Sequence, residues 1–206
     1  MPALLDEFLA ALETANEADF AALAAAGVGD AALLRLPIPG VVGAAPVRPL
    51  AGGLYEPAGE GAESAIRAWI FPTNLLGTVR HATPEDLIAI AQRPPHRWRL
   101  RLGAATVLGA HEIERRSFAP ARAWHRDVLD GPTEEPLALW QTPLAWLKAG
   151  CRGAVVLDWP AAAFDLLGIW TAIVAEDVGH GLDIRRRLRR PVPCPPIRVP
   201  AGKEAA

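Results

Sequence analysis

Cysteine is scarce in this sequence, which contains only Cys151 and Cys194. Two isolated cysteines exclude a zinc knuckle and a disulfide framework. Long apolar runs are also missing, since none approaches the roughly 20 residues that cross a bilayer. The first residues lack the basic and apolar regions of a secretory signal. We therefore expect a cytoplasmic protein without a membrane partner.

The motifs of the common catalytic classes are missing as well. The sequence has no glycine-rich phosphate loop of the Walker or dinucleotide type, and no His-x-x-x-His pair. Its two serines, Ser64 and Ser117, do not lie in a nucleophile elbow. With 206 residues, 51% of them hydrophobic, the chain can still bury one sizeable core. The sequence thus indicates a globular protein without a complete catalytic constellation.

Lysine is almost absent, because every basic side chain except Lys148 and Lys203 is an arginine. The formal net charge of −2 gives no overall basic field that would attract nucleic acid. The charges are unevenly distributed, however: acids dominate the amino-terminal segment, and arginines cluster in the middle and near the end. Arginine suits phosphate because its planar fork donates two parallel hydrogen bonds. The arginine clusters are therefore the candidate phosphate-binding surfaces.

The apolar pattern divides the chain into a helical amino-terminal segment (1–37), a β-rich middle (38–130), an α/β unit (131–200) and a tail (201–206). Within the middle, residues 98–102 are predicted to form a strand and residues 103–116 a helix. In the α/β unit, apolar runs alternate with helical patterns, the runs at 137–140, 154–159 and 172–175 and the helices at 143–150, 160–168 and 178–190. Such alternation is typical of a parallel sheet with crossover helices. The predicted fold class is therefore α/β (or α+β), with a mainly parallel carboxy-terminal sheet.

Acidic side chains follow two of these predicted strands. Asp158 comes after one strand, and Glu176 and Asp177 come after the next. In open α/β sheets, ligands bind outside the carboxyl ends of the strands, and carboxylates gathered there suit Mg²⁺. Asp158, Glu176 and Asp177 are therefore candidate metal ligands. The alternative is that Asp158 and Asp177 cap the helices that follow them, since acids accept hydrogen bonds from the free N–H groups of a helix start.

The same stretch resembles a known family. Residues 153–190 run from a hydrophobic strand with an acid, through small residues and a helix, to a second strand with an acidic pair. This pattern is similar to a degenerate Toprim domain of primase- and topoisomerase-type proteins, in which Glu-Gly and Asp-x-Asp motifs jointly hold Mg²⁺. Here Asp158 and Trp159 replace the Glu-Gly, and the adjacent Glu176 and Asp177 replace the spaced pair. The resemblance implies Mg²⁺ at these acids, and the departures imply a non-catalytic relative.

The sequence His-Arg-Trp-Arg-Leu-Arg at 96–101 interleaves an aromatic ring with arginines. Aromatic side chains and cations together hold single strands of nucleic acid without sequence preference. In a strand, Arg97, Arg99 and Arg101 would share one face, about 7 Å apart, and Trp98 would lie on the other. These three arginines are the candidate nucleic-acid-binding residues. The alternative is a solvated arginine stripe above a core tryptophan.

These patterns favour an accessory or interaction protein of nucleic-acid metabolism, non-catalytic and related to phages or mobile elements. Its expected partner is nucleic acid, bound weakly and without sequence specificity, or another protein. A second interpretation is a Mg²⁺-dependent phosphotransfer or nuclease-type enzyme that uses the acids at the sheet edge. A third is a scaffold that contacts another protein through its tryptophans. Convergence of the carboxylates of Asp158, Glu176 and Asp177 would favour the enzyme.

Overall fold

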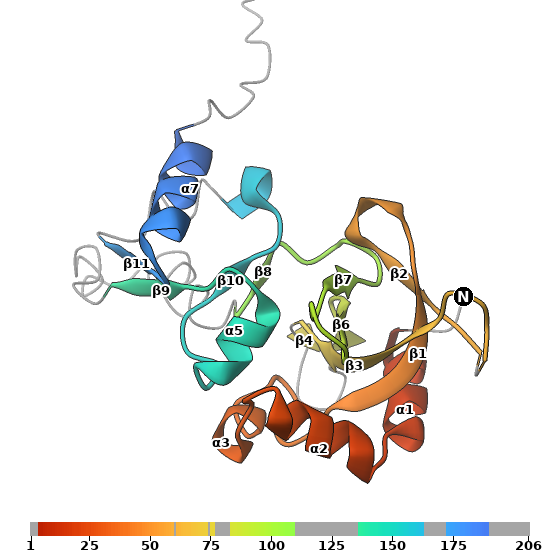
Figure 1. Ribbon diagram of the computed structural model, residues 1–206. Helices are drawn as coiled ribbons and strands as arrows, with labels where there is room; N and C mark the ends of the chain where they lie inside the picture. Colours follow the sequence, from red (N-terminus) through yellow and green to blue (C-terminus); the bar gives the residue numbers. More distant parts are fainter. Residues whose placement is uncertain are drawn as a thin grey trace, which may run out of the picture.

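The computed structural model describes residues 4–59, 61–73, 75–76, 83–109, 136–162 and 172–189. The first of these form the helices α1 (Leu4–Thr14), α2 (Glu17–Ala25) and α3 (Asp30–Leu33), shown in Figure 1. Helix α2 begins at a capping box: the Asn16 side chain accepts a hydrogen bond from the Asp19 backbone, and the Asp19 carboxylate accepts one from the Asn16 backbone. The predicted helical start of the chain is therefore observed.

A five-stranded antiparallel sheet follows, with strand order β2-β1-β3-β6-β7. Its strands are β1 (Gly43–Pro49), β2 (Tyr55–Pro57), β3 (Ile66–Pro72), β6 (Leu87–Ala91) and β7 (Trp98–Leu100). A short 3-10 helix, η1 (Ala51–Gly53), connects β1 to β2, and β4 (Leu75–Leu76) pairs separately with β5 (Thr83–Pro84). Leu54, just before β2, forms a bridge with Leu100 of β7. The sheet therefore curls until its two edge strands meet.

Large side chains cover the convex face of this curled sheet. Trp69 of β3 lies opposite Ile90 of β6, and Phe71 lies opposite Ile88. Because alternate residues of a strand share a face, these four side chains form one apolar surface. All of them belong to a core cluster that also contains residues of α2, α3 and the later helix α5 (Pro143–Lys148). The convex face thus forms one side of the main core.

The concave face carries a second apolar cluster, and it is closed at one end by α1. Its buried members are Val47, Tyr55, Ala68, Ile70, Leu87 and Ala89. Phe8 and Ala11 of α1 belong to the same cluster. Gly43 allows this close packing, because a Cβ atom there would lie 2.8 Å from the Cβ of Ala11. Helix α1 therefore covers one end of the curl and leaves the other end to be formed by loops.

The carboxy-terminal unit has strands and helices where several were predicted, but not the predicted sheet, and residues 163–168 of the helix predicted at 160–168 lie outside the described residues. Its elements are β8 (Val107–Leu108), β9 (Leu137–Leu139), α5, β10 (Val155–Val156), β11 (Ile173–Ala175) and α7 (Val178–Leu188). The expected mainly parallel sheet is wrong, because the one parallel sheet among the described residues contains only the two strands β9 and β11. Strand β10 instead pairs antiparallel with β8, which comes from the middle of the chain. The alternation of elements predicted their type, whereas their order in the sheet depends on a distant strand.

The helix predicted at 103–116 is also wrong in its described part, where β8 lies. Asp86 explains the difference. Its side chain is fully buried, and its carboxylate accepts hydrogen bonds from the backbone N–H groups of Arg101, Leu102 and Ala104. Gly103, between them, has a φ of +72°. These bonds hold the segment after β7 in a turn, and residues 110–116 lie outside the described residues.

One core joins the three predicted segments of the chain. Its largest cluster combines Leu23 from the amino-terminal helices, Trp69 from the curled sheet, and Trp146 and Val155 from the carboxy-terminal unit. The division at 1–37, 38–130 and 131–200 stays a prediction about domain boundaries. Across the described part of the chain, the helices are all too short or too polar to cross a membrane.

Candidate functional site

The two aspartates of the predicted acidic edge lie at helix starts. Asp177 is the N-cap of α7, and its Oδ1 accepts a hydrogen bond of 2.7 Å from the backbone N–H of His180. Asp158 precedes the helical residues 159–162, and its Oδ1 accepts a longer bond of 3.4 Å from the N–H of Ala161. The capping alternative is confirmed for Asp177, and the contact of Asp158 is of the same kind.

Glu176 points to a different partner, the backbone N–H of Gln141, from which its Oε1 accepts a hydrogen bond. The described residues contain no group of three or more acidic, histidine or cysteine side chains placed to hold a metal ion. The acids thus do not fit Mg²⁺ as they lie in this structure. A Mg²⁺ site of Asp158, Glu176 and Asp177, and the enzyme that would use it, stay predictions.

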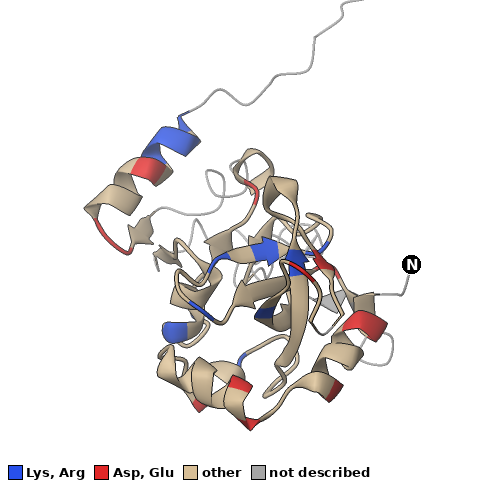
Figure 2. Ribbon diagram, turned by 45° about the vertical axis from the view of Figure 1, so that its right-hand side comes forward, with Lys and Arg blue, Asp and Glu red and all other residues tan. Residues whose placement is uncertain are grey.

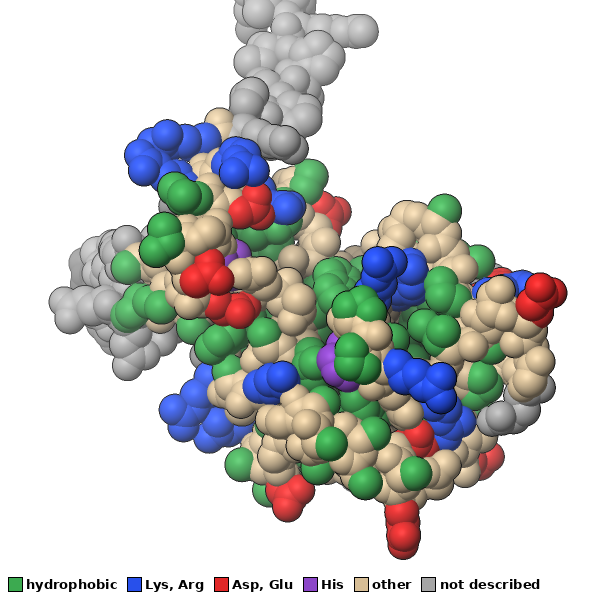
Figure 3. Space-filling model, viewed as in Figure 1, with side chains coloured by type: hydrophobic (Ala, Val, Ile, Leu, Met, Phe, Trp, Pro, Cys, Tyr) green, Lys and Arg blue, Asp and Glu red, His purple; other side chains and the backbone are tan. Residues whose placement is uncertain are grey.

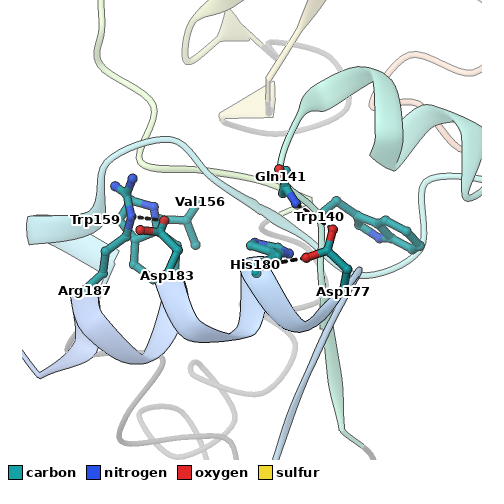
Figure 4. A pocket seen from close by; sticks show the side chains of 9 residues that line it. Trp140, Gln141, Val156, Trp159, Asp177, His180, Asp183 and Arg187 are labelled. Carbon is teal, nitrogen blue, oxygen red and sulfur yellow. Dashed lines mark hydrogen bonds and ion pairs between the residues drawn. The ribbon is translucent and has the colours of Figure 1, made fainter.

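A polar hollow of about 430 Å³ lies between α7 and the strand ends. Figure 4 shows Asp177, His180, Asp183 and Arg187 along one side of α7, with Trp159 near Arg187. Arg187 donates a 2.6 Å hydrogen bond to Asp183 and lies 5.3 Å from the centre of the Trp159 ring. This hydrogen bond lowers the pKa of the Asp183 carboxyl. The main charges of the hollow are therefore paired with one another.

The three candidate arginines lie on the concave face of the curled sheet. Arg99 of β7 is opposite Ala89, which belongs to the concave cluster. Trp98 points the other way and packs against the main core, as the alternating pattern predicted. Along the stripe, Arg97 is exposed, whereas Arg99 and Arg101 are both partly buried. The stripe thus runs from the open end of the curl into its interior.

Arg101 forms an ion pair within the protein. Its Nε donates a 2.7 Å hydrogen bond to Glu7 of α1, and the side chains of Arg101 and Glu7 are only 16% and 8% exposed. Tyr55 donates to the other oxygen of Glu7 at 3.1 Å. Burial, together with the negative charge of Glu7, raises the pKa of Tyr55 far above its ordinary value. Arg101 therefore joins α1 to the sheet and is not positioned to bind a ligand.

Arg97 and Arg99 instead line a cavity of about 670 Å³ at the open end of the curl, which we call the arginine mouth. Four arginines are among its lining residues, which include no aspartate or glutamate: Pro49, Ala65, Ile66, Arg67, Ala91, Gln92, Arg93, Pro94, Pro95, Arg97 and Arg99. Guanidinium groups that outnumber the nearby acids attract an anion. The mouth is therefore the best candidate for a ligand site.

Arg99 has unused hydrogen-bonding capacity within the mouth. Its Nη1 donates a 3.1 Å bond to the backbone oxygen of Leu50. Its Nε is buried and has no hydrogen-bond partner among the described residues. A buried donor without a partner is costly in a folded protein. An anion could accept from this Nε, and remove that cost, only after a shift of the Arg99 side chain, because the atom has almost no accessible surface.

Arg67 and Gln92, at the rim of the mouth, are held by a single carboxylate. Asp19 of α2 accepts hydrogen bonds from Arg67 at 2.7 Å and from Gln92 at 2.7 Å. Asp19 is 4% exposed, and its bond with Arg67 lowers the pKa of its carboxyl to about 2. The charge of Arg67 is thus matched by Asp19. The positive charge of the mouth comes from Arg93, Arg97 and Arg99.

Acidic and basic residues also lie on different parts of the molecular surface. Figure 2 shows acidic residues on the amino-terminal helices, and basic residues on the sheet and at the end of α7. In Figure 3, basic side chains gather on the visible face of the sheet unit and again at the tip of α7.

Sequence reasoning missed Arg93 and Gln92. The Gln-Arg-Pro-Pro turn between two predicted strands was the available signal, because prolines fix the backbone direction of such a turn.

Comparisons of this chain with protein-family models, with curated proteins and with solved structures return no match. The resemblance of residues 153–190 to Toprim domains therefore stays a prediction.

Proposed function

We propose that this protein is an accessory protein of nucleic-acid metabolism, which binds single-stranded nucleic acid through the arginine mouth. The observation that carries the proposal is the cavity itself, in which Arg93, Arg97 and Arg99 meet without an acidic lining residue. Phosphate is the anion that nucleic acid offers at regular intervals, and arginine binds it through its planar fork. Binding of this kind depends on charge and not on base sequence.

Two features favour a single strand over a duplex. Arg99 lies in β7 and Arg97 directly precedes that strand, and their two-position spacing corresponds to about 7 Å in extended backbone. This spacing is close to that of successive phosphates on an extended single strand. The positive groups also lie in a hollow and not along a wide surface. A flexible single strand can follow such a hollow, whereas a rigid duplex contacts a broader face.

Titration of a labelled oligothymidine at several low salt concentrations tests the proposal. We expect weak binding of the wild-type protein, with an affinity that falls as salt rises. The double variant Arg97→Ala/Arg99→Ala should bind more weakly. Its slope of log affinity against log salt should be less steep by about 1.4, because each lost phosphate contact removes roughly 0.7 from that slope.

The matched control is Arg185→Ala/Arg189→Ala, which removes the same charge from the exposed side of α7. This variant should keep both the affinity and the salt dependence of the wild type. Equal losses in the two double variants would show that binding follows net charge alone and would contradict the proposal. Absence of wild-type binding at tens of micromolar protein would contradict it as well.

A further inference from the structure

The shape of the arginine mouth restricts which part of a strand can enter it. The mouth is a hollow with a floor, because the concave face beneath it is filled by buried side chains such as Tyr55, Ala68 and Ala89. At the far end, Phe8 of α1 and the Glu7–Arg101 pair close the curl. A strand cannot continue through the floor of such a hollow, so a strand that points into it ends there.

The charge of the mouth points to the same part of a strand. Arg93, Arg97 and Arg99 contribute three positive charges, and the residues that line the mouth include no acid to balance them. An internal phosphodiester carries a single negative charge, whereas a phosphate monoester carries about −1.5 to −2 at neutral pH, with three acceptor oxygens. A monoester therefore matches the mouth better in charge and in hydrogen-bonding capacity.

Arg99 has donors available for this group. Its Nη1 is bound to the carbonyl of Leu50, which holds the guanidinium beside the mouth. Its buried Nε has no hydrogen-bond partner among the described residues. Because this atom has almost no accessible surface, the side chain must shift before the edge that carries Nε can donate two parallel bonds to two oxygens of one phosphate. Arg97, two positions away on the same face and exposed, can contact the next phosphate of the strand.

We infer that the arginine mouth binds the terminal phosphate monoester of a nucleic-acid strand. This inference rests on the proposed function, since it names the part of the single strand that the same site would recognise. A free nucleotide carries the same group, so the two sources must be separated by experiment.

Isothermal titration calorimetry at low salt with three oligothymidines of equal length makes this test. One strand has hydroxyl groups at both ends, one has a 5′-phosphate and one has a 3′-phosphate. We expect at least one phosphorylated strand to bind about tenfold more tightly than the hydroxyl strand, because hydrogen bonds between charged groups are worth this factor or more. Equal affinity for all three strands would overturn the inference and leave the proposed function standing.

Thymidine monophosphate, titrated in the same way, separates the two sources of the phosphate. Weaker binding of the mononucleotide than of the phosphorylated strand supports the strand end as the ligand. Binding of the mononucleotide without binding of any strand would assign the site to free nucleotides and overturn both the inference and the proposed function. Failure of all four probes to bind would also overturn both.

The variant Arg99→Gln tests the orientation argument, because it keeps a donor for Leu50 and removes the charge. The advantage of the phosphorylated strand should fall to less than about twofold in this variant. Because Arg99 is partly buried, its replacement can disturb the local structure. Arg97→Ala, at an exposed position, is a second variant that leaves this structure intact. Arg185→Ala on α7 should keep the full advantage. An unchanged advantage in both mouth variants would contradict the assignment.

Discussion

Replacement of Trp146 by alanine is expected to destabilise the protein by about 3–5 kcal/mol, the usual cost of removing a large aromatic side chain from a core. Trp146 lies in α5, has no exposed surface and belongs to the cluster that joins all three parts of the chain. Its Nε1 also donates a 3.0 Å hydrogen bond to the backbone oxygen of Gly153. The variant would lose both the packing and this bond.

Equilibrium unfolding in urea measures this effect. The control is Leu182→Ala on α7, where the side chain is 56% exposed and the expected change is within about 0.5 kcal/mol. If Trp146→Ala unfolded at the same urea concentration as the wild type, the shared core would not exist as described.

The Asp19 carboxylate should make stability depend on pH in the acidic range. Its pKa is about 2 in the folded protein, compared with 3.8 in the absence of its partners. A lowered folded pKa stabilises the protein above the unfolded pKa, and this contribution disappears as the pH falls from about 4 to 2. The shift corresponds to about 2 kcal/mol. This stabilisation comes from the hydrogen bond that Arg67 of the sheet donates to Asp19 of α2.

Urea unfolding of the wild type and of Asp19→Asn across this pH range tests the prediction. The variant should be less stable near neutral pH, and the difference between the two proteins should shrink toward pH 2. Asp6→Asn, at an exposed position of α1, should retain the wild-type pH dependence. Parallel curves for the wild type and Asp19→Asn would show that this carboxylate does not couple folding to protonation.

Local patterns in the sequence predicted the local structure of this protein well. The apolar spacing located α1 and α2, the run Leu87–Ala91 became β6, and the acid before α7 became its cap. Each of these features depends on residues that are neighbours in sequence. The order of strands in a sheet depends on distant partners. The pairing of β10 with β8 could not be derived from the pattern around β10, and the predicted parallel sheet was therefore wrong.

The same distinction applies to the candidate site. Strand alternation predicted that Arg97, Arg99 and Arg101 share a face, but it treated the three as equivalent. The structure separates them because α1 brings Glu7 against Arg101 from 94 positions away in the sequence. Asp86 acts over a much shorter range, 16 to 18 positions, when it binds the backbone after β7. The Glu7 carboxylate, distant in sequence, thus pairs with Arg101, whereas Arg97 and Arg99 line the mouth.

Arginine Nε–H signals in solution NMR test most directly whether the arginines of the mouth hold the nucleic acid. Addition of an oligothymidine at low salt should shift the Nε–H signals of Arg99 and Arg97. The signal of Arg101, paired with Glu7, should stay in place. The signals of Arg185 and Arg189 on α7 should also stay in place. Shifts confined to the α7 arginines, or no shift at Arg99 and Arg97, would contradict the account.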